Sequence, residues 1–443
     1  MTLTGVLIAV ASVAALFAMT YAVRVAGLHY GWPAEVQRKL VHVGVGIYAM
    51  LLPLVLDKGA FILFAVLALA ALLVLRSPWA GKRAGASLHS VERRSWGDLL
   101  FLVAVTVLFV RAPGDPALYL LPIAVLTLSD AAAAVVGTEY GRRRFGAGDR
   151  LKSMEGTVAF FVVTWMVAMT ILVAATDVPR VNTVLLATVV AAFAAQVEAE
   201  SWKGLDNLFV PVGIHALLTF NDDTDPRLLA VLTCAFIALI VFAQKCSQWF
   251  GMTPHAGRSN AVCLFLAAGM TSPQHAILPV AAFMAHVASR RDAANPDLDD
   301  LDFVAVVSLI GVFWLTVGGL TGRITSEFYT ISFAGVFAGL AVLTLSTRAF
   351  YWRFAAAAAI SIFTWWLQHW TLADDTADVL WAGRTQMAIT AALTILACAI
   401  GAAWRPILPF RRGALFAALV LAISAISFGL AIAGGWPSDG RIR

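Results

Sequence analysis

The side chains best suited to chemistry occur in four short stretches of an otherwise apolar chain. In the first, Glu35, Arg38, Lys39 and His42 follow Pro33 at three- and four-residue spacings, so they share one face of a helix. Arg38 and Lys39 alone could be ordinary cations at the end of a membrane helix. His42 lies one turn deeper, where a polar side chain is costly unless it is paired or binds a ligand. We therefore expect this face to contribute to a functional site.

The second stretch centres on Asp130, which lies inside an apolar run and shares a helical face with Ala134, Gly137 and Gly141. A carboxylate in such a segment must be paired or must hold a cation. The alternative is a helix-packing face on which Asp130 makes a structural hydrogen bond. Because small side chains leave room beside the carboxylate, we favour a ligand site.

The third stretch follows a basic loop and ends in Lys152, Ser153 and Glu155 at the start of the next apolar run. A helix N-terminus carries free N–H groups and partial positive charge, so a lysine in front of it predicts an anion pocket. Glu155 in the same turn could hold Mg²⁺ against phosphates, and Ser153 is also a good N-cap. The arginines at 142–144 are interpreted as ordinary markers of the cytoplasmic side.

The fourth stretch runs from Glu198 to Asn207 and crowds carboxylates between two apolar runs. Glu198 and Asp206 could not both stay ionised in close, dry proximity without a cation, which favours a divalent metal held through a few carboxylates and nucleotide phosphates. Glu200 is interpreted as a solvated charge at the end of a helix.

The composition excludes a soluble enzyme. The 443 residues are 60% hydrophobic and 13% charged, against about 45–50% and about 25% in soluble proteins. The formal net charge of +5 is too small to indicate a nucleic-acid partner. The four cysteines form no C-x-x-C pair, so neither a disulfide framework nor a thiolate metal site is expected.

The elements that must position these groups are predicted to be membrane helices. Many of the apolar runs approach the length of about 20 residues that spans a bilayer, so we expect an all-α polytopic fold with about 14–16 transmembrane segments. The runs are 3–26, 37–56, 59–75, 98–111, 117–138, 156–176, 182–200, 208–220, 228–244, 259–270, 274–290, 302–320, 327–346, 353–370, 385–402 and 413–435.

The distribution of charge predicts both topology and domains. With the N-terminus outside, most of the 31 lysines and arginines fall on the cytoplasmic side, as the positive-inside rule requires. The functional groups lie before residue 225, so we expect a functional domain at 1–225 and an added helical module at 226–443. The second half is expected to lack buried carboxylates. Short loops leave no room for an inserted soluble domain, so the site is expected at the membrane.

Taken together, the motifs resemble the phytol kinase/dolichol kinase family of integral-membrane lipid kinases, which includes a CTP-using diacylglycerol kinase. The resemblance covers about residues 30–220, and Ser129 stands where many members have glycine. It implies transfer of the γ-phosphoryl group of a nucleoside triphosphate, often CTP, to a long-chain lipid alcohol at the cytoplasmic face. A bacterial plasma membrane is the expected location.

On this basis each site residue receives an expected role. Phosphoryl transfer needs positioning and charge neutralisation more than covalent chemistry. His42 or a carboxylate would accept the alcohol proton, and the lipid tail would enter along the small-residue face of 130–141. The expected assignments are catalysis by Asp130, Lys152, Glu155 and His42, nucleotide binding by Arg38, Lys39, Lys152, Ser153 and Asn207, and Mg²⁺ binding by Asp130, Glu198 and Asp206.

Two other functions are weighed against a kinase. A CDP-alcohol phosphotransferase would need a D-G-x2-A-R signature, but alanines follow Asp130; a cytidylyltransferase is the related possibility. A transporter would use the buried charges as an ion pathway and would show broken helices in both halves. The expected lack of buried carboxylates in the second half counts against it.

Overall fold

The protein folds as two units of membrane helices. The structure is a computed structural model that describes residues 2–76, 96–112, 114–145, 152–201, 204–221, 224–270, 273–289, 296–345, 350–374, 382–403 and 412–433. Its two compact units are Met1–Ile237 and Ala238–Arg443. The predicted functional boundary near residue 225 lies close to this division, but the roles assigned to the two halves stay predictions.

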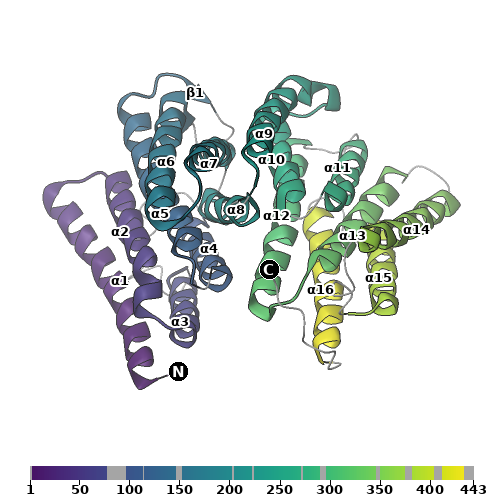
Figure 1. Cartoon of the computed structure of the whole chain (residues 1–443), viewed down its shortest axis with the longest axis horizontal. Helices are drawn as coiled ribbons and strands as arrows, with labels where there is room; N and C mark the ends of the chain where they lie inside the picture. The colour runs from purple at the N-terminus through teal and green to yellow at the C-terminus, as the bar shows by residue number, and fades with distance from the viewer. Residues whose placement is uncertain are drawn as a thin grey trace. The chain divides into compact units, whose positions relative to one another are not determined.

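The N-terminal unit holds eight helices and one small hairpin in the described part of the chain (Figure 1). They are α1 (Leu3–Tyr30), α2 (Ala34–Val55), α3 (Lys58–Arg76), α4 (Gly97–Arg111), α5 (Pro116–Glu139), β1 (Arg144–Phe145), β2 (Lys152–Ser153), α6 (Met154–Ala175), α7 (Arg180–Glu200) and α8 (Asp206–Asn221). The antiparallel hairpin pairs Arg144 with Ser153 and Phe145 with Lys152, and the sequence pattern did not predict it.

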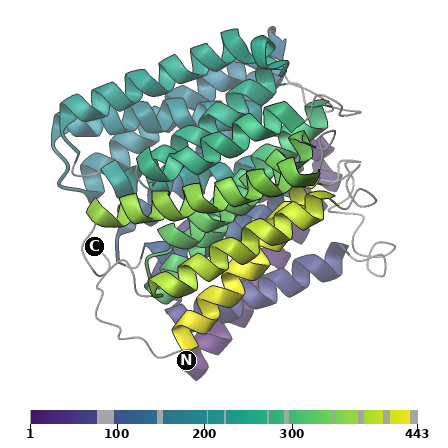
Figure 2. The same ribbon diagram turned by 90° about the vertical axis from the view of Figure 1, so that its right-hand side faces the viewer.

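α9 crosses the boundary between the units, and the helices that follow it form the C-terminal unit, whose long helices run roughly side by side in Figure 2. They are α9 (Pro226–Cys246), η2 (Ser247–Phe250), α10 (Pro254–Met270), η3 (Pro273–Ala276), α11 (Ile277–Ser289), α12 (Pro296–Thr321), α13 (Ser326–Thr344), α14 (Phe350–Asp374), α15 (Arg384–Ala403) and α16 (Arg412–Ala433). The core of this unit centres on α13, where Phe328 and Phe333 are fully buried.

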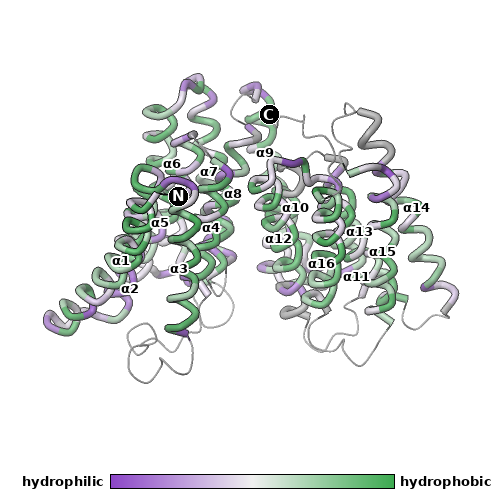
Figure 3. The backbone as a smooth tube through the Cα atoms, turned by 90° about the horizontal axis from the view of Figure 1, so that it is seen from below, coloured by the Kyte–Doolittle hydropathy of each residue, from purple (hydrophilic) through white to green (hydrophobic). Residues whose placement is uncertain are grey.

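The expected all-helical membrane fold is confirmed. Among the described residues, eleven helices are long and apolar enough to cross a membrane. Figure 3 shows hydrophobic colour along the helices and hydrophilic colour mostly near their ends. Helix starts follow the local sequence: Pro33 and Pro179 stand directly before α2 and α7, and the Asp115 carboxylate accepts the Leu118 N–H at 3.0 Å to cap α5. These are residues that favour a helix N-terminus.

Close packing fixes α2 against α5 and α5 against α6. A Cβ added at Gly46 in α2 would lie 2.1 Å from Thr127 Oγ1 in α5, so glycine is needed for this approach. The buried Ser129 hydroxyl, one residue before Asp130, accepts a hydrogen bond from Thr164 Oγ1 in α6 at 3.0 Å. The helix that carries Asp130 is therefore held on both sides.

One expectation about the second half is wrong, because two carboxylates are buried there. Asp300 is 0% exposed and Glu327 is 3% exposed. Each lies near the start of a helix, in α12 and α13, where the sequence pattern indicates only a solvated end charge. Burial at a helix end depends on neighbouring helices, and the single sequence carries no sign of them.

Candidate functional site

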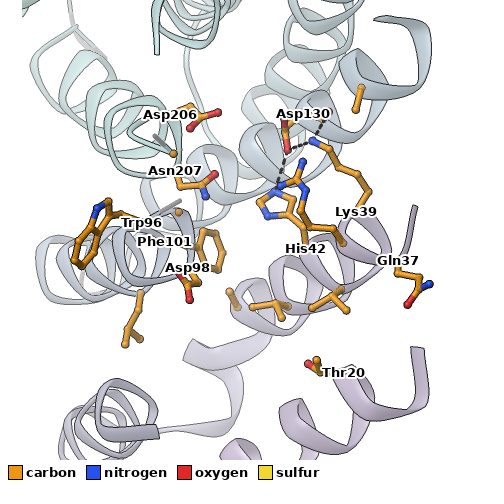
Figure 4. Close-up of a pocket in the computed structure, with 18 of the residues that line it drawn as sticks. Thr20, Gln37, Lys39, His42, Trp96, Asp98, Phe101, Asp130, Asp206 and Asn207 are labelled. Carbon is orange, nitrogen blue, oxygen red and sulfur yellow. Dashed lines mark hydrogen bonds and ion pairs between the residues drawn. The ribbon is translucent and has the colours of Figure 1, made fainter. Parts of the chain in front are cut away.

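The first cluster of the site joins α2 to α5. Lys39 Nζ lies 2.6 Å from Asp130 Oδ2 and 3.3 Å from the Asp130 carbonyl oxygen. His42 Nε2 lies 3.5 Å from the same carboxylate oxygen. Figure 4 shows the three side chains pointing toward one another. Asp130 is therefore paired, as the cost of a carboxylate in an apolar helix requires, and its side chain stays 16% exposed.

The second cluster joins the hairpin to the end of α7. Lys152 Nζ donates to Glu198 Oε1 at 2.7 Å and also to the Glu198 carbonyl oxygen. Burial alone would lower the pKa of the Lys152 ammonium, but the charges of Glu198 and Asp206 outweigh it and raise the pKa above its ordinary value. Lys152 is therefore a firmly protonated cation next to the N-terminus of α6.

Ser153 and Glu155 hold the local backbone around Lys152. Ser153 Oγ accepts the Gly156 N–H at 3.1 Å and caps α6, which is the plain role open to it. Glu155 Oε2 accepts the backbone N–H groups of Arg142 and Arg143 at 3.1 and 3.3 Å. The Glu155 carboxylate thus holds the backbone at Arg142 and Arg143. It does not line the cavity that Lys152 and Ser153 line.

The start of α8 supplies a third group. Gly204, with φ of 88°, takes the left-handed backbone that favours glycine, and the chain then turns into α8 at Asp206 and Asn207. In Figure 4 these two side chains lie across the site from Lys39. Within the described part of the chain, no hydrogen bond to the Asp206 carboxylate is found, and its charge acts on Lys152.

All three clusters line one cavity of about 1220 Å³ in the N-terminal unit. Its polar end has both lysine–carboxylate pairs, and its other walls are apolar side chains of α1, α2, α3 and α4. The predicted site residues that line it are Arg38, Lys39, His42, Asp130, Lys152, Ser153, Glu198, Asp206 and Asn207. Four stretches far apart in the sequence therefore meet around one volume.

Two charged residues of these stretches have other partners. Arg38 lines the cavity, but its guanidinium is 46% exposed and pairs with Glu35 at 2.6 Å. Glu200, interpreted from the sequence as solvated, is 5% exposed and accepts a hydrogen bond from Gln196 Nε2 at 3.0 Å. That interpretation is wrong, because α7 is buried up to its last turn.

The carboxylates do not form a ready-made metal cage. In the described ranges, no group of three or more His, Cys, Asp or Glu side chains is placed to hold one ion. Asp130 and Glu198 are each paired with a lysine, which leaves Asp206 as the freest carboxylate of the predicted set. The assignment of all three to Mg²⁺ stays a prediction.

The small-residue face of α5 packs closely on the hairpin at its C-terminal end. A Cβ at Gly137 would lie 2.9 Å from Ser153 Oγ, and one at Gly141 would lie 2.2 Å from the Gly137 carbonyl oxygen. Asp130, Ala134 and Gly137 of this face nevertheless line the cavity. The route expected for a lipid tail along 130–141 therefore stays a prediction.

Sequence reasoning missed the groups that α3 and α4 add to the site. Phe101 faces His42 with ring centroids 6.0 Å apart, and the Arg76 guanidinium pairs with Asp98 and lies 5.1 Å from the centre of the Trp96 ring. All four side chains line the cavity. The sequence did hold a signal for them, because Arg76 stands at the end of one apolar run and the oppositely charged Asp98 at the start of the next.

Comparison with known proteins agrees with this picture. The chain is 32% identical over 185 residues to a phytol kinase of Synechocystis sp., and the match covers 41% of this chain and 77% of that relative. No family model matches the chain. No solved structure matches it either.

Proposed function

The chain belongs to the phytol kinase family and is a membrane-embedded lipid-alcohol kinase. On this premise we propose that it transfers the γ-phosphoryl group of CTP to a long-chain lipid alcohol such as phytol, a polyprenol, dolichol or diacylglycerol. The alcohol oxygen attacks the γ-phosphorus and the bond to the β–γ bridging oxygen breaks. CDP leaves, and the hydroxyl proton passes to a base. The observation that best supports this proposal is the single cavity with a charged end and apolar walls.

The cations of the cavity neutralise the triphosphate. Lys39 comes from α2 and Lys152 from β2, and their carboxylate partners hold the ammonium groups in place before the nucleotide binds. Such preorganised charge is most effective where water is largely excluded. Arg38, whose side chain is 46% exposed, adds a further cation. Ser153 and Asn207 contribute polar groups beside the phosphates.

A divalent cation fits the charge balance of the cavity. The six cations that line it are nearly offset by five carboxylates, so a bound triphosphate would leave several negative charges uncompensated; the cations are Arg24, Arg38, Lys39, Arg76, Arg144 and Lys152, and the carboxylates are Glu35, Asp98, Asp130, Glu198 and Asp206. Magnesium is usually held by one or two carboxylates together with phosphates rather than by a protein cage. Asp206 and the amide oxygen of Asn207 are the hard oxygen donors in the right place. When bound, the ion would neutralise charge that builds up on the phosphates during transfer.

His42 is the proposed base for the hydroxyl proton. Asp130 and Glu198 are engaged by lysines, which makes them poorer bases, whereas His42 lies between the charged end and the apolar walls. The Asp130 carboxylate, 3.5 Å from Nε2, stabilises the imidazolium that forms when the proton is accepted.

We place the charged end at the cytoplasmic face, in a bacterial plasma membrane. Arg24, Arg38 and Arg76 line the same end of the cavity, and arginines at membrane helix ends are enriched on the cytoplasmic side. Nucleoside triphosphates are also found there.

The proposal is tested with purified full-length protein, phytol and γ-labelled nucleotide. Labelled phytyl phosphate is expected with CTP and Mg²⁺, and less of it with ATP. Asp130→Asn should lose most of this activity, because Lys39 and His42 lose their shared partner. Asp57→Asn is the matched control, since Asp57 only caps α3 through its contact with Ala60. No transfer from any nucleotide to any lipid alcohol, with folded protein, would contradict the proposal.

A further inference from the structure

The apolar part of the cavity has the form of a slot with one closed end. Along α2 it reaches from His42 to Leu52, a distance of about 15 Å at about 1.5 Å per residue. That is half the hydrocarbon thickness of about 30 Å, or one leaflet. Leu52 and Phe64 are nearly fully buried at the far end, so they form its floor.

The walls of the slot converge toward that floor. A Cβ at Gly5 of α1 would lie 3.2 Å from Ala60 Cβ of α3, so the two helices almost touch there. The Tyr48 hydroxyl donates to Ser12 and ties α2 to α1 about two turns of α1 closer to the charged end. Figure 3 shows α1 and α3 separating from this end, and nearer the charged end Thr20 of α1 and other side chains of both helices line the cavity.

The gap between α1 and α3 opens to the surface of the unit. Phe17 and Leu73 line the cavity, yet they are 40% and 53% exposed. Both lie in helices that are apolar enough to cross the membrane, so this opening faces lipid rather than water. A molecule dissolved in the bilayer can reach the slot sideways without passing through the charged end.

We propose that the hydrocarbon chain of the acceptor alcohol enters between α1 and α3 and lies in this slot, with its hydroxyl at His42 and its chain directed toward Leu52 and Phe64. The inference rests on the proposed kinase function. A lipid alcohol is the expected occupant because the slot is continuous with the charged end, is lined mainly by apolar side chains apart from Thr20 and Tyr48, and is open to lipid.

The slot contributes position rather than hydrophobic driving force. The bilayer is as apolar as the slot, so moving a chain from one to the other gains little. A chain held against the floor fixes the depth of its hydroxyl relative to His42. A misplacement of about 1 Å can reduce a rate by about 10²-fold, so the slot acts on the efficiency with which the bound alcohol reacts.

The direct test uses photochemical labelling, which does not require phosphoryl transfer. Dodecanol with a diazirine at the chain end, whose extended chain matches the slot in length, is irradiated with full-length protein in nanodiscs, and the labelled peptides are identified by mass spectrometry. Labelling is expected around Leu52 and Phe64. A hydrocarbon of equal length with the same diazirine and no hydroxyl reports the background from surrounding lipid. Labels from the alcohol that match this background would overturn the proposal.

A kinetic test separates the slot from the kinase activity. Ala68 lines the slot, whereas Ala70 on the same helix is exposed and does not line it. Ala68→Trp should lower kcat/KM for dodecanol by about 10²-fold and leave hexanol, which occupies only the part of the slot next to His42, within twofold. Ala70→Trp should match the wild type for both alcohols.

The outcomes of the two experiments are distinct. If the wild type phosphorylates dodecanol and Ala68→Trp does so equally well, the slot is refuted while the kinase function stands. If the wild type phosphorylates no alcohol, the proposed function itself fails, and the labelling pattern still reports where an alcohol chain binds.

Discussion

Buried carboxylates occur in both units, but their surroundings differ. In the N-terminal unit, Asp130 and Glu198 face a large cavity, are paired with lysines and remain 16% and 11% exposed at the side chain. In the C-terminal unit, Asp300 is completely buried and lies 2.8 Å from His286 Nε2, and that ring stacks on Phe303 with centroids 4.6 Å apart. The first set can exchange partners with a ligand, whereas the second is enclosed by side chains.

This difference shows that a buried charge alone does not identify a binding site. Ionisable residues in membrane helices are functional candidates by default, and by that rule both sets would qualify. Access to a cavity separates them. We therefore expect changes at Asp130 or Lys152 to affect chemistry, and changes at Asp300 to affect folding.

The largest effect is expected at Lys152. Lys152→Met removes a preorganised cation from the phosphates, and the loss of one such group typically lowers kcat by about 10²–10³-fold. The measurement is initial-rate transfer of labelled phosphate from CTP to phytol. Lys58→Met is the matched control, because Lys58 is an exposed lysine at the start of α3. Equal rates for Lys152→Met and wild type would remove Lys152 from the site.

A smaller effect is expected at Asp206, through the metal. Asp206→Asn weakens a hard oxygen donor, so the Mg²⁺ concentration for half-maximal activity should rise about tenfold, a change of about 1.4 kcal/mol. Asp225→Asn is the control, since Asp225 precedes α9 as an exposed cap outside the cavity. A Mg²⁺ dependence that is the same in both variants would assign the metal to other groups.

The smallest effect on activity is expected at Asp300. Asp300→Asn should leave the rate per folded molecule within twofold of wild type. It should lower the stability by about 1–3 kcal/mol, because a fully buried hydrogen-bond partner of His286 is weakened. Asp130→Asn should do the reverse, with little change in thermal unfolding and a large loss of rate. A loss of catalytic rate in Asp300→Asn would instead show that the C-terminal unit contributes to catalysis.

Much of the fold could be predicted because long apolar runs leave few alternatives in a membrane. Each expected run corresponds to a helix in the described structure, and start signals such as Pro33 and Pro179 mark their first residues. The hairpin that carries Lys152 could not be predicted, since its two-residue strands have no periodicity to detect. It nevertheless directs the lysine toward Glu198.

The site could be predicted in its charged part and not in its apolar part. Lys39, Asp130, Lys152 and Asp206 stand out as charges within or next to apolar runs. The slot is formed by alanine, leucine and phenylalanine side chains that look like any others in α1 and α3. Only tertiary structure distinguishes a side chain that faces a cavity from one that faces lipid.

If Lys39 and Lys152 bind the same magnesium–triphosphate, both must contribute to the affinity for the nucleotide. Binding of a CTP analogue with a methylene group between the β- and γ-phosphorus atoms is measured calorimetrically with and without Mg²⁺, using full-length protein and its Lys39→Met, Lys152→Met and Asp300→Asn variants. We predict Mg²⁺-dependent binding that is weakened at least tenfold in both lysine variants and unchanged in Asp300→Asn. Wild-type affinity in either lysine variant would contradict the account.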